Sequence, residues 1–182
     1  MPPLPPGDIN ANISPTEFEL LIKEYLDSVG KDIKNFNSNH NSHIERSDGE
    51  YQIDVYVEFE VLGAVFKVLI ECKRHKAEIK REVVQLLYDK LRATGAQKGM
   101  IFSTSGFQSG AYKFADEHGI ALIRVIEGRY TYVTKAAGGQ SYDPPPWADT
   151  PKYVGEYVRG ATITYLQKGY FEDFAEFLFG NP

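Results

Sequence analysis

Residues 52–61 alternate strictly between polar and apolar side chains, a period typical of a β-strand with one buried face. Leu62 and Gly63 then predict a turn, and residues 66–73 alternate again. The two runs therefore predict a β-hairpin. Its expected buried face carries Ile53, Val55, Val57, Phe59 and Val61 in the first strand and Phe66, Val68, Ile70 and Cys72 in the second.

A helical period precedes the hairpin. Ser14 and Pro15 are residue types favoured at a helix cap and at the first helical position, and Gly30 is a type that ends helices. We therefore expect a helix over residues 15–29, then a polar loop over residues 31–49 with a short strand near residues 43–46. The apolar positions with helical spacing are Phe18, Leu21, Ile22, Tyr25, Leu26 and Val29.

The second half of the chain alternates helices and short apolar strands. A helix that contains Val83, Val84, Leu87 and Leu91 is expected to end near Gly95, and a strand follows at residues 99–104. Residues 111–118 predict another helix, and residues 120–126 are apolar enough for a buried strand. The order αβββαβαβ predicts an α/β fold with a mixed central sheet flanked by helices.

Composition divides the chain into three parts. The proline-rich residues 1–13 predict an extended tail, residues 14–135 one domain, and residues 136–182 a linker followed by an aromatic arm. Acidic residues in the arm disfavour stacking on nucleic-acid bases. We expect the arm to pack on the domain or to form a homodimer contact through Trp147, Tyr153, Tyr157, Tyr165, Tyr170, Phe171, Phe174 and Phe177.

Composition also limits the chemistry. The single cysteine, Cys72, excludes an internal disulfide and an all-thiolate zinc site. No run approaches the roughly 18–20 apolar residues of a membrane span, so we expect a cytoplasmic protein without a membrane partner. The net charge is -5, yet residues 73–98 are locally basic. This basic run is either a solvated helix face or a track for phosphate groups.

The polar faces of the two hairpin strands bring Asp54 beside Glu71 and Lys73. Side chains at positions i and i+2 of a strand project to the same side, so Glu71 and Lys73 lie together while Cys72 points into the core. Two neighbouring carboxylates repel unless a cation lies between them, and hard oxygen ligands suit Mg²⁺ or Mn²⁺. Lys73 would then orient a water molecule or stabilise a transition state. A turn position for Asp54 and a solvated strand end for Glu71 and Lys73 are the structural alternative.

The chain resembles the Mrr-like restriction endonuclease family of the PD-(D/E)XK nuclease superfamily over about residues 15–126. The segments that carry the resemblance are TEFELLIKEYLDSVG, GEYQIDVYVEF, VLIECKRHK, VVQLLYDKL and GMIFSTSGFQSGAYKFADEHGIALI, in this order. One departure is that GEYQID has the single Gly49 where the family has a double glycine. The resemblance implies a restriction-endonuclease-like fold and a metal-dependent endonuclease that hydrolyses DNA.

The same resemblance implies roles for individual residues. Asp54 and Glu71 would bind the metal ion, Mg²⁺ with Mn²⁺ as the substitute, and Lys73 would complete the site. The backbone carbonyl of Cys72 would be a further metal ligand. Gln85 would lie at the edge of the site, and Glu19 on the first helix would support it.

Other polar residues are expected to contact DNA or to have structural roles. Residues 103–106, STSG, open a predicted helix and either offer backbone amides to a phosphate or form a plain cap. We expect His40 and His43 to be polar loop residues. The alternatives to a DNA endonuclease are an inactive nuclease-fold module for DNA binding or assembly and a nuclease acting on RNA or branched DNA. The expected nucleic-acid contacts are Arg74, His75, Lys76, Lys80 and Arg81.

Overall fold

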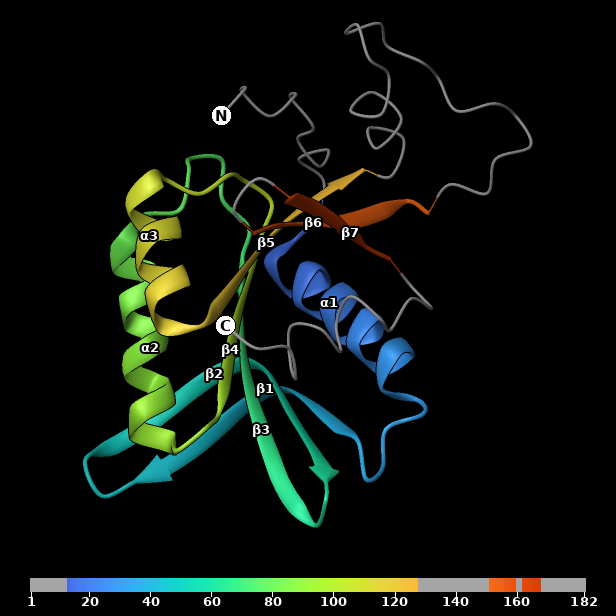
Figure 1. Cartoon of the computed structure of the whole chain (residues 1–182), viewed down its shortest axis with the longest axis vertical. Coiled ribbons are helices and arrows are strands. Elements are labelled where there is room, and N and C mark those ends of the chain that lie inside the picture. The colour runs from blue at the N-terminus through green and yellow to red at the C-terminus, as the bar shows by residue number, and fades with distance from the viewer. Residues whose placement is uncertain (1–12, 128–150, 160–161, 168–182) are drawn as a thin grey trace, which may run out of the picture.

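The structure is a computed structural model that describes residues 13–127, 151–159 and 162–167 (Figure 1). The predicted order αβββαβαβ is confirmed, and two further strands follow it. The elements are α1 (Pro15–Gly30), β1 (Asn37–Arg46), β2 (Gly49–Val61), β3 (Ala64–Lys73), α2 (Arg81–Thr94), β4 (Lys98–Ser103), α3 (Ser109–His118), β5 (Ile120–Glu127), β6 (Tyr153–Arg159) and β7 (Thr162–Leu166).

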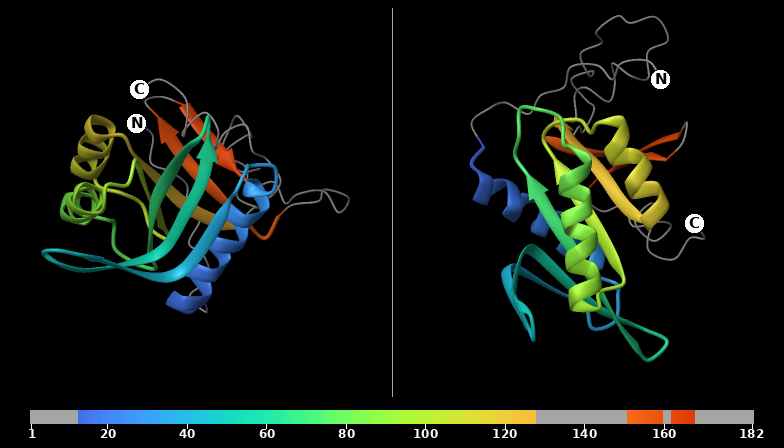
Figure 2. Two further views of the ribbon diagram at one scale, coloured as in Figure 1. Left: turned by 90° about the horizontal axis from the view of Figure 1, so that it is seen from below. Right: turned by 90° about the vertical axis from the view of Figure 1, so that its left-hand side faces the viewer.

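The strands form one mixed sheet in the order β1-β2-β3-β4-β5-β6-β7. The pairs from β1 to β3 are antiparallel, those from β3 to β5 are parallel, and those from β5 to β7 are antiparallel again. Figures 1 and 2 show α1 on one face of the sheet and α2 beside α3 on the other. The fold is therefore α/β with a flanked mixed sheet, as predicted.

Each face of the sheet has its own hydrophobic core. The core under α1 contains Phe18, Ile22 and Leu26 from the helix and Val55, Val57, Phe59, Val68, Ile70, Cys72, Met100 and Phe102 from the strands. The core under α2 and α3 contains Val84, Leu87, Leu91, Ala111 and Ala115 from the helices and Ile53, Leu69, Ile101 and Leu122 from the strands. The strands between the two cores are thus apolar on both faces, which burial beneath helices requires.

The helix ends follow the sequence signals with one exception. Ser14 and Glu17 form a reciprocal capping box at the start of α1, and Gly95 ends α2 with a left-handed φ of 70°. Gly30, in contrast, is the last residue of α1 itself and is not left-handed. The residue that caps the helix is Lys31, with a right-handed φ of -54°. A Cβ atom on Gly30 would overlap the ring of Phe36, so close packing explains this glycine.

The prediction of a polar loop over residues 31–49 is wrong for most of its length. β1 spans Asn37–Arg46 and pairs with β2 from Asn37↔Glu58 to Arg46↔Gly49. Polar residues dominate this strand, so no apolar period marks it in the sequence. Its stability comes from the ladder with β2, and a polar composition suits a strand at the edge of a sheet.

The sheet also extends past the predicted domain boundary at residue 135. β6 and β7 lie within residues 136–182, which we expected to form a linker and an aromatic arm, and β6 pairs with β5. Tyr153 and Tyr157 pack against the core under α1, as the expectation of packing on the domain requires. The tail residues 1–12 and the aromatic residues Trp147, Tyr170, Phe171, Phe174 and Phe177 lie outside the described residues.

Candidate active site

The ladder between β2 and β3 opens at Asp54. Paired residues run from Val61↔Ala64 to Val55↔Ile70, and the next two residues, Asp54 and Glu71, are not paired with each other. The backbone N–H of Cys72 instead donates a hydrogen bond of 2.7 Å to Oδ2 of Asp54. At this point the Asp54 carboxylate, and not a backbone carbonyl of β2, accepts the hydrogen bond from β3. The carboxylate is therefore held beside the end of β3.

The strict alternation predicted for β2 also changes at Asp54. Val55 and Val57 belong to the core under α1, whereas Ile53 belongs to the core under α2 and α3. Opposite this point, Asn41 of β1 has a positive φ of 51°, and the register passes from His40↔Val55 to Ser42↔Ile53. The prediction that Ile53 shares a face with Val55 is therefore wrong, and the change of face coincides with the left-handed conformation of Asn41 on the neighbouring strand.

Glu71 is the centre of a buried ionic cluster. Its Oε2 accepts a hydrogen bond of 2.8 Å from Nζ of Lys73, and its Oε1 accepts one from Nζ of Lys90 on α2. The Lys73 ammonium also lies 3.9 Å from Oδ2 of Asp54. The side chains of Glu71, Lys90, Asp54 and Lys73 are 6%, 16%, 19% and 25% exposed. Asp54, Glu71 and Lys73 therefore come together as the sequence predicted.

Lys90 is a member of this cluster that the sequence analysis did not identify. Its ammonium donates a second hydrogen bond of 2.8 Å to the backbone carbonyl of Gln52, two residues before Asp54. Leu87 and Leu91 fix the orientation of α2 by packing into the core, which turns Lys90 toward β2 and β3. The signal available in the sequence was helical spacing, which places Lys90 next to the buried positions Leu87 and Leu91.

Glu19 of α1 lies close enough to the cluster to act on its charges. Its Oε2 is 2.6 Å from Nε2 of His40, which belongs to β1 and not to a loop. The Glu19 carboxylate acts electrostatically on Asp54 and Cys72. This position agrees with a supporting role for Glu19, which stays a prediction.

The cluster shifts the protonation equilibria of its members. Burial and the neighbouring Glu71 carboxylate raise the pKa of Asp54, and the hydrogen bond from Cys72 opposes this shift. Burial disfavours the charged form of Lys73, but the Glu71 and Asp54 carboxylates together outweigh burial and raise the pKa of Lys73. Burial also raises the pKa of the Cys72 thiol well above its ordinary value. Cys72 is therefore a core thiol without nucleophilic character.

Gln85 is exposed on α2, five residues before Lys90, and five residues correspond to a rotation of roughly 140° around a helix. The two side chains therefore leave α2 on different sides. Lys90 is the residue of α2 that contacts Glu71, and the expected place of Gln85 at the edge of the site stays a prediction.

The loop that follows Lys73 and the first residue of α2, together called the basic loop, present the predicted nucleic-acid contacts. Arg74, His75, Lys76, Lys80 and Arg81 are all exposed. The Arg81 guanidinium also lies 5.1 Å from the centre of the Phe114 ring, so part of its surface is engaged with α3. An exposed group of basic residues directly after the ionic cluster is the arrangement expected of a phosphate track.

Hydroxyl groups at the end of β4 hold this loop in place. The backbone N–H of Thr104 donates to the carbonyl of Lys73 at 3.1 Å, and its hydroxyl bonds to both the N–H and the carbonyl of His75 at 3.0 Å. Ser105 donates to the carbonyl of Ala77 at 2.8 Å.

Residues 103–106, STSG, do not open a helix. The two interpretations of this segment, as a phosphate site at a helix start and as a plain helix cap, are both wrong, because α3 begins only at Ser109 and Gln108 is its N-cap.

The donor set fits a hard divalent ion. Within residues 13–127, 151–159 and 162–167, no three His, Cys, Asp or Glu side chains are grouped to hold a metal. The carboxylates of Asp54 and Glu71 are two oxygen donors, and magnesium is commonly held by one or two carboxylates together with substrate phosphates. The set therefore suits Mg²⁺ or Mn²⁺ at a substrate site better than a structural metal. The backbone carbonyl of Cys72 as a third ligand stays a prediction.

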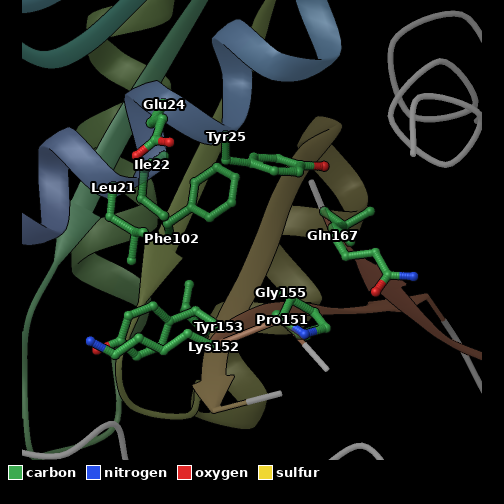
Figure 3. A pocket seen from close by; sticks show the side chains of 13 residues that line it. Leu21, Ile22, Glu24, Tyr25, Phe102, Pro151, Lys152, Tyr153, Gly155 and Gln167 are labelled. Atoms are coloured by element: carbon green, nitrogen blue, oxygen red, sulfur yellow. The ribbon is translucent and has the colours of Figure 1, made fainter. Parts of the chain in front are cut away.

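A pocket of about 340 Å³ lies on the other face of the sheet, between α1 and β6. Figure 3 shows Tyr25 and Phe102 on one side of it and Lys152 and Tyr153 on the other. None of the residues of the ionic cluster lines this pocket. It is therefore separate from the candidate active site. None of the described helices has the length and apolar character of a membrane span.

Three comparisons place the chain among known proteins. Residues 10–127 match the family model of the Mrr catalytic domain, which is described as a restriction endonuclease. The type IV methyl-directed restriction enzyme EcoKMrr of Escherichia coli (strain K12) is 29% identical over 114 residues, which are 61% of this chain and 35% of that protein. The chain thus spans about a third of the length of this relative.

Solved structures resemble the chain over a similar share of its length. The protein of unknown function AF1548 is 21% identical with a TM-score of 0.46, and the match covers 59% of this chain and 55% of that one. The MspJI restriction endonuclease in complex with a 27-mer oligonucleotide is 21% identical with a TM-score of 0.41, over 59% and 25% of the two chains.

Proposed function

From the premise that the chain belongs to the Mrr-type restriction endonuclease family, we propose that it is a metal-dependent endonuclease that hydrolyses phosphodiester bonds of DNA. The observation that carries this proposal is the convergence of Asp54, Glu71 and Lys73 where the β2–β3 ladder opens. A buried and a half-buried carboxylate beside an ammonium are costly for stability and are typical of a functional site.

The side chains of this cluster have distinct proposed tasks. Asp54 and Glu71 hold Mg²⁺ or Mn²⁺, which when bound polarises the scissile phosphate and lowers the pKa of water. Lys73 carries a persistent positive charge, because Glu71 raises its pKa, and it can hold a water molecule or stabilise negative charge on the phosphate. Lys90 orients Glu71 from the side of α2.

The basic loop gives the proposed site its substrate class. Arg74, His75, Lys76, Lys80 and Arg81 follow the cluster directly and are exposed, so phosphates on either side of the scissile bond can bind there. The restriction enzymes to which the chain is related make DNA the first candidate among nucleic acids.

Cleavage assays on a substrate panel test this function. The protein is incubated with double-stranded, methylated, single-stranded and branched DNA and with RNA, each in Mg²⁺, in Mn²⁺ and in EDTA. We expect cleavage of DNA that requires the metal and is lost in Asp54→Ala and Glu71→Gln. If only RNA or only branched DNA is cleaved, that nucleic acid is the substrate in place of linear DNA. DNA binding without cleavage would favour an inactive module for DNA docking or assembly.

A further inference from the structure

Glu71 is engaged by two ammonium groups at once. Lys73 donates to Oε2 and Lys90 donates to Oε1, so each carboxylate oxygen accepts a hydrogen bond from an ammonium group. The side chain of Lys90 is only 16% exposed, and its ammonium also donates a hydrogen bond to the carbonyl of Gln52. Glu71 is thus neutralised by fixed charges of the protein itself.

The charges of the cluster balance in this state. The ammonium groups of Lys73 and Lys90 match the carboxylates of Asp54 and Glu71. A divalent ion would add two positive charges beside two carboxylates that these ammonium groups already offset, and the Glu19 carboxylate is a further negative charge that acts on Asp54. In a poorly solvated environment the repulsion between the ion and a nearby ammonium is strong. The phosphates of a nucleic acid are the groups that could offset this excess.

We propose that Lys90 makes binding of the divalent ion depend on bound nucleic acid, because its charge keeps the metal affinity of the free protein low. This inference rests on the proposed function. It assigns Lys90 as a positioning residue that acts through Glu71 and does not touch the substrate. Phosphates placed beside the cluster supply negative charge, so the metal and the nucleic acid bind cooperatively.

Replacing Lys90 separates this proposal from a purely structural role. Lys90→Met removes the charge and keeps an unbranched side chain of similar length, whereas Lys90→Arg keeps the charge. If Lys90 only orients Glu71, its loss weakens metal binding. If its charge opposes the metal, its loss strengthens metal binding to the free protein.

The experiment measures Ca²⁺ affinity by titration calorimetry with and without a DNA duplex. We expect the duplex to strengthen Ca²⁺ binding to the unsubstituted protein by tenfold or more. Lys90→Met should lower the Kd of the DNA-free protein for Ca²⁺ by about tenfold, since a unit charge in contact with a ligand is removed. In Lys90→Met the duplex should then increase the Ca²⁺ affinity by a smaller factor. Lys90→Arg should behave like the unsubstituted protein.

Two controls complete the design. Lys113→Met removes an exposed positive charge on α3. The ion-pair partners of Glu71 are instead Lys73 and Lys90, so this variant should leave Ca²⁺ affinity unchanged. Thermal melting provides a second readout. Lys90→Met should have a lower melting temperature in EDTA, because Glu71 loses an ion-pair partner, and Ca²⁺ should raise its melting temperature more than that of the unsubstituted protein. If Lys90→Met does not fold, Lys90→Gln takes its place.

The outcomes distinguish this inference from the proposed function. Unchanged or weaker Ca²⁺ binding by folded Lys90→Met, in a protein that binds Ca²⁺ and cleaves DNA, overturns the inference alone. The same holds if Lys90→Arg behaves like Lys90→Met. Failure of the unsubstituted protein to bind Ca²⁺ even with the DNA duplex present, or Ca²⁺ binding to the duplex complex that Asp54→Ala leaves unchanged, overturns the proposed function and the inference together.

Discussion

The N–H of Cys72 donates a 2.7 Å hydrogen bond to the carboxylate of Asp54 at the place where β2 and β3 separate. The hydrogen bond comes from the backbone of β3, so Asp54 is oriented without any metal ion. The same strand carries Glu71 and Lys73 on either side of Cys72. One stretch of three residues therefore fixes the relative positions of the whole proposed catalytic group.

Asp54→Asn should abolish cleavage and at the same time stabilise the metal-free protein. Asparagine can still accept the hydrogen bond from Cys72, but it removes a buried charge next to Glu71. Removal of such strain at a functional site commonly gives roughly 0.5–2 kcal/mol. Thermal melts in EDTA and cleavage assays in Mg²⁺ measure the two effects. A variant that melts below the unsubstituted protein would contradict the expected gain.

The gain from Asp54→Asn should depend on pH with a defined sign. Because burial raises the pKa of Asp54 in the folded protein above its ordinary value of 3.8, the folded state binds the proton more tightly than the unfolded chain. The charged carboxylate therefore destabilises the fold at neutral pH. This penalty fades as the pH falls through the folded pKa toward 3.8, and the advantage of the variant should fade with it. Exposed Asp116→Asn is the matched control.

Lys73→Ala should lower the cleavage rate by about a hundredfold or more while DNA binding in Ca²⁺ stays within a few-fold of normal, as expected for a group that acts in the transition state. Single-turnover cleavage in Mg²⁺ and binding in Ca²⁺ measure the two quantities. Asp54→Ala should differ, because its defect should appear in the metal dependence. Equal losses of binding and cleavage in Lys73→Ala would assign Lys73 to substrate binding instead.

Thr104→Val should weaken DNA binding through the loop that Thr104 holds. The substitution keeps the shape and removes two hydrogen bonds to His75, each with a net value of about 0.5–1.5 kcal/mol. DNA affinity is measured well below the melting temperature, where both proteins are folded. Thr104→Ser keeps the hydroxyl and should bind DNA normally. Normal binding by Thr104→Val would show that the loop does not need this clamp.

The salt dependence of DNA binding should fall when the basic loop is neutralised. Each phosphate contact contributes roughly one unit to the slope of log affinity against log salt. A variant with alanine at Arg74, Lys76, Lys80 and Arg81 should therefore lose up to about four units of slope. Lys31→Ala, on the side of α1, should leave the slope unchanged. A slope that the fourfold variant retains would place the phosphate track elsewhere.

Short-range signals made most of the fold predictable. Residues 52–61 and 66–73 show the two-residue period, and Gly95 and Gly119 mark helix ends that the structure has with left-handed φ values. The meeting of Asp54 with Glu71 and Lys73 followed from the hairpin, because the turn at Leu62 and Gly63 fixes its register.

Long-range packing accounts for what the sequence did not reveal. β1 has no apolar period of its own and is held by its ladder with β2, and β6 pairs with β5, which ends far earlier in the chain. Lys90 is one of many charged residues of α2, and only the docking of the helix against β4 selects it for Glu71. Close contact between Leu91 and Gly99, where a Cβ atom would meet Leu91 at 2.9 Å, sets that docking.

The position of β6 decides where the chain can be shortened. β5 is buried along nearly its whole length and has β4 on one side and β6 on the other. Ending the polypeptide at residue 127, the limit of the family match, would leave the main-chain N–H and C=O groups on the β6 side of an apolar strand without partners. Such an edge pairs readily with another copy. A fragment cut there should aggregate, and an expression boundary after β7 should yield a monodisperse sample by size-exclusion chromatography.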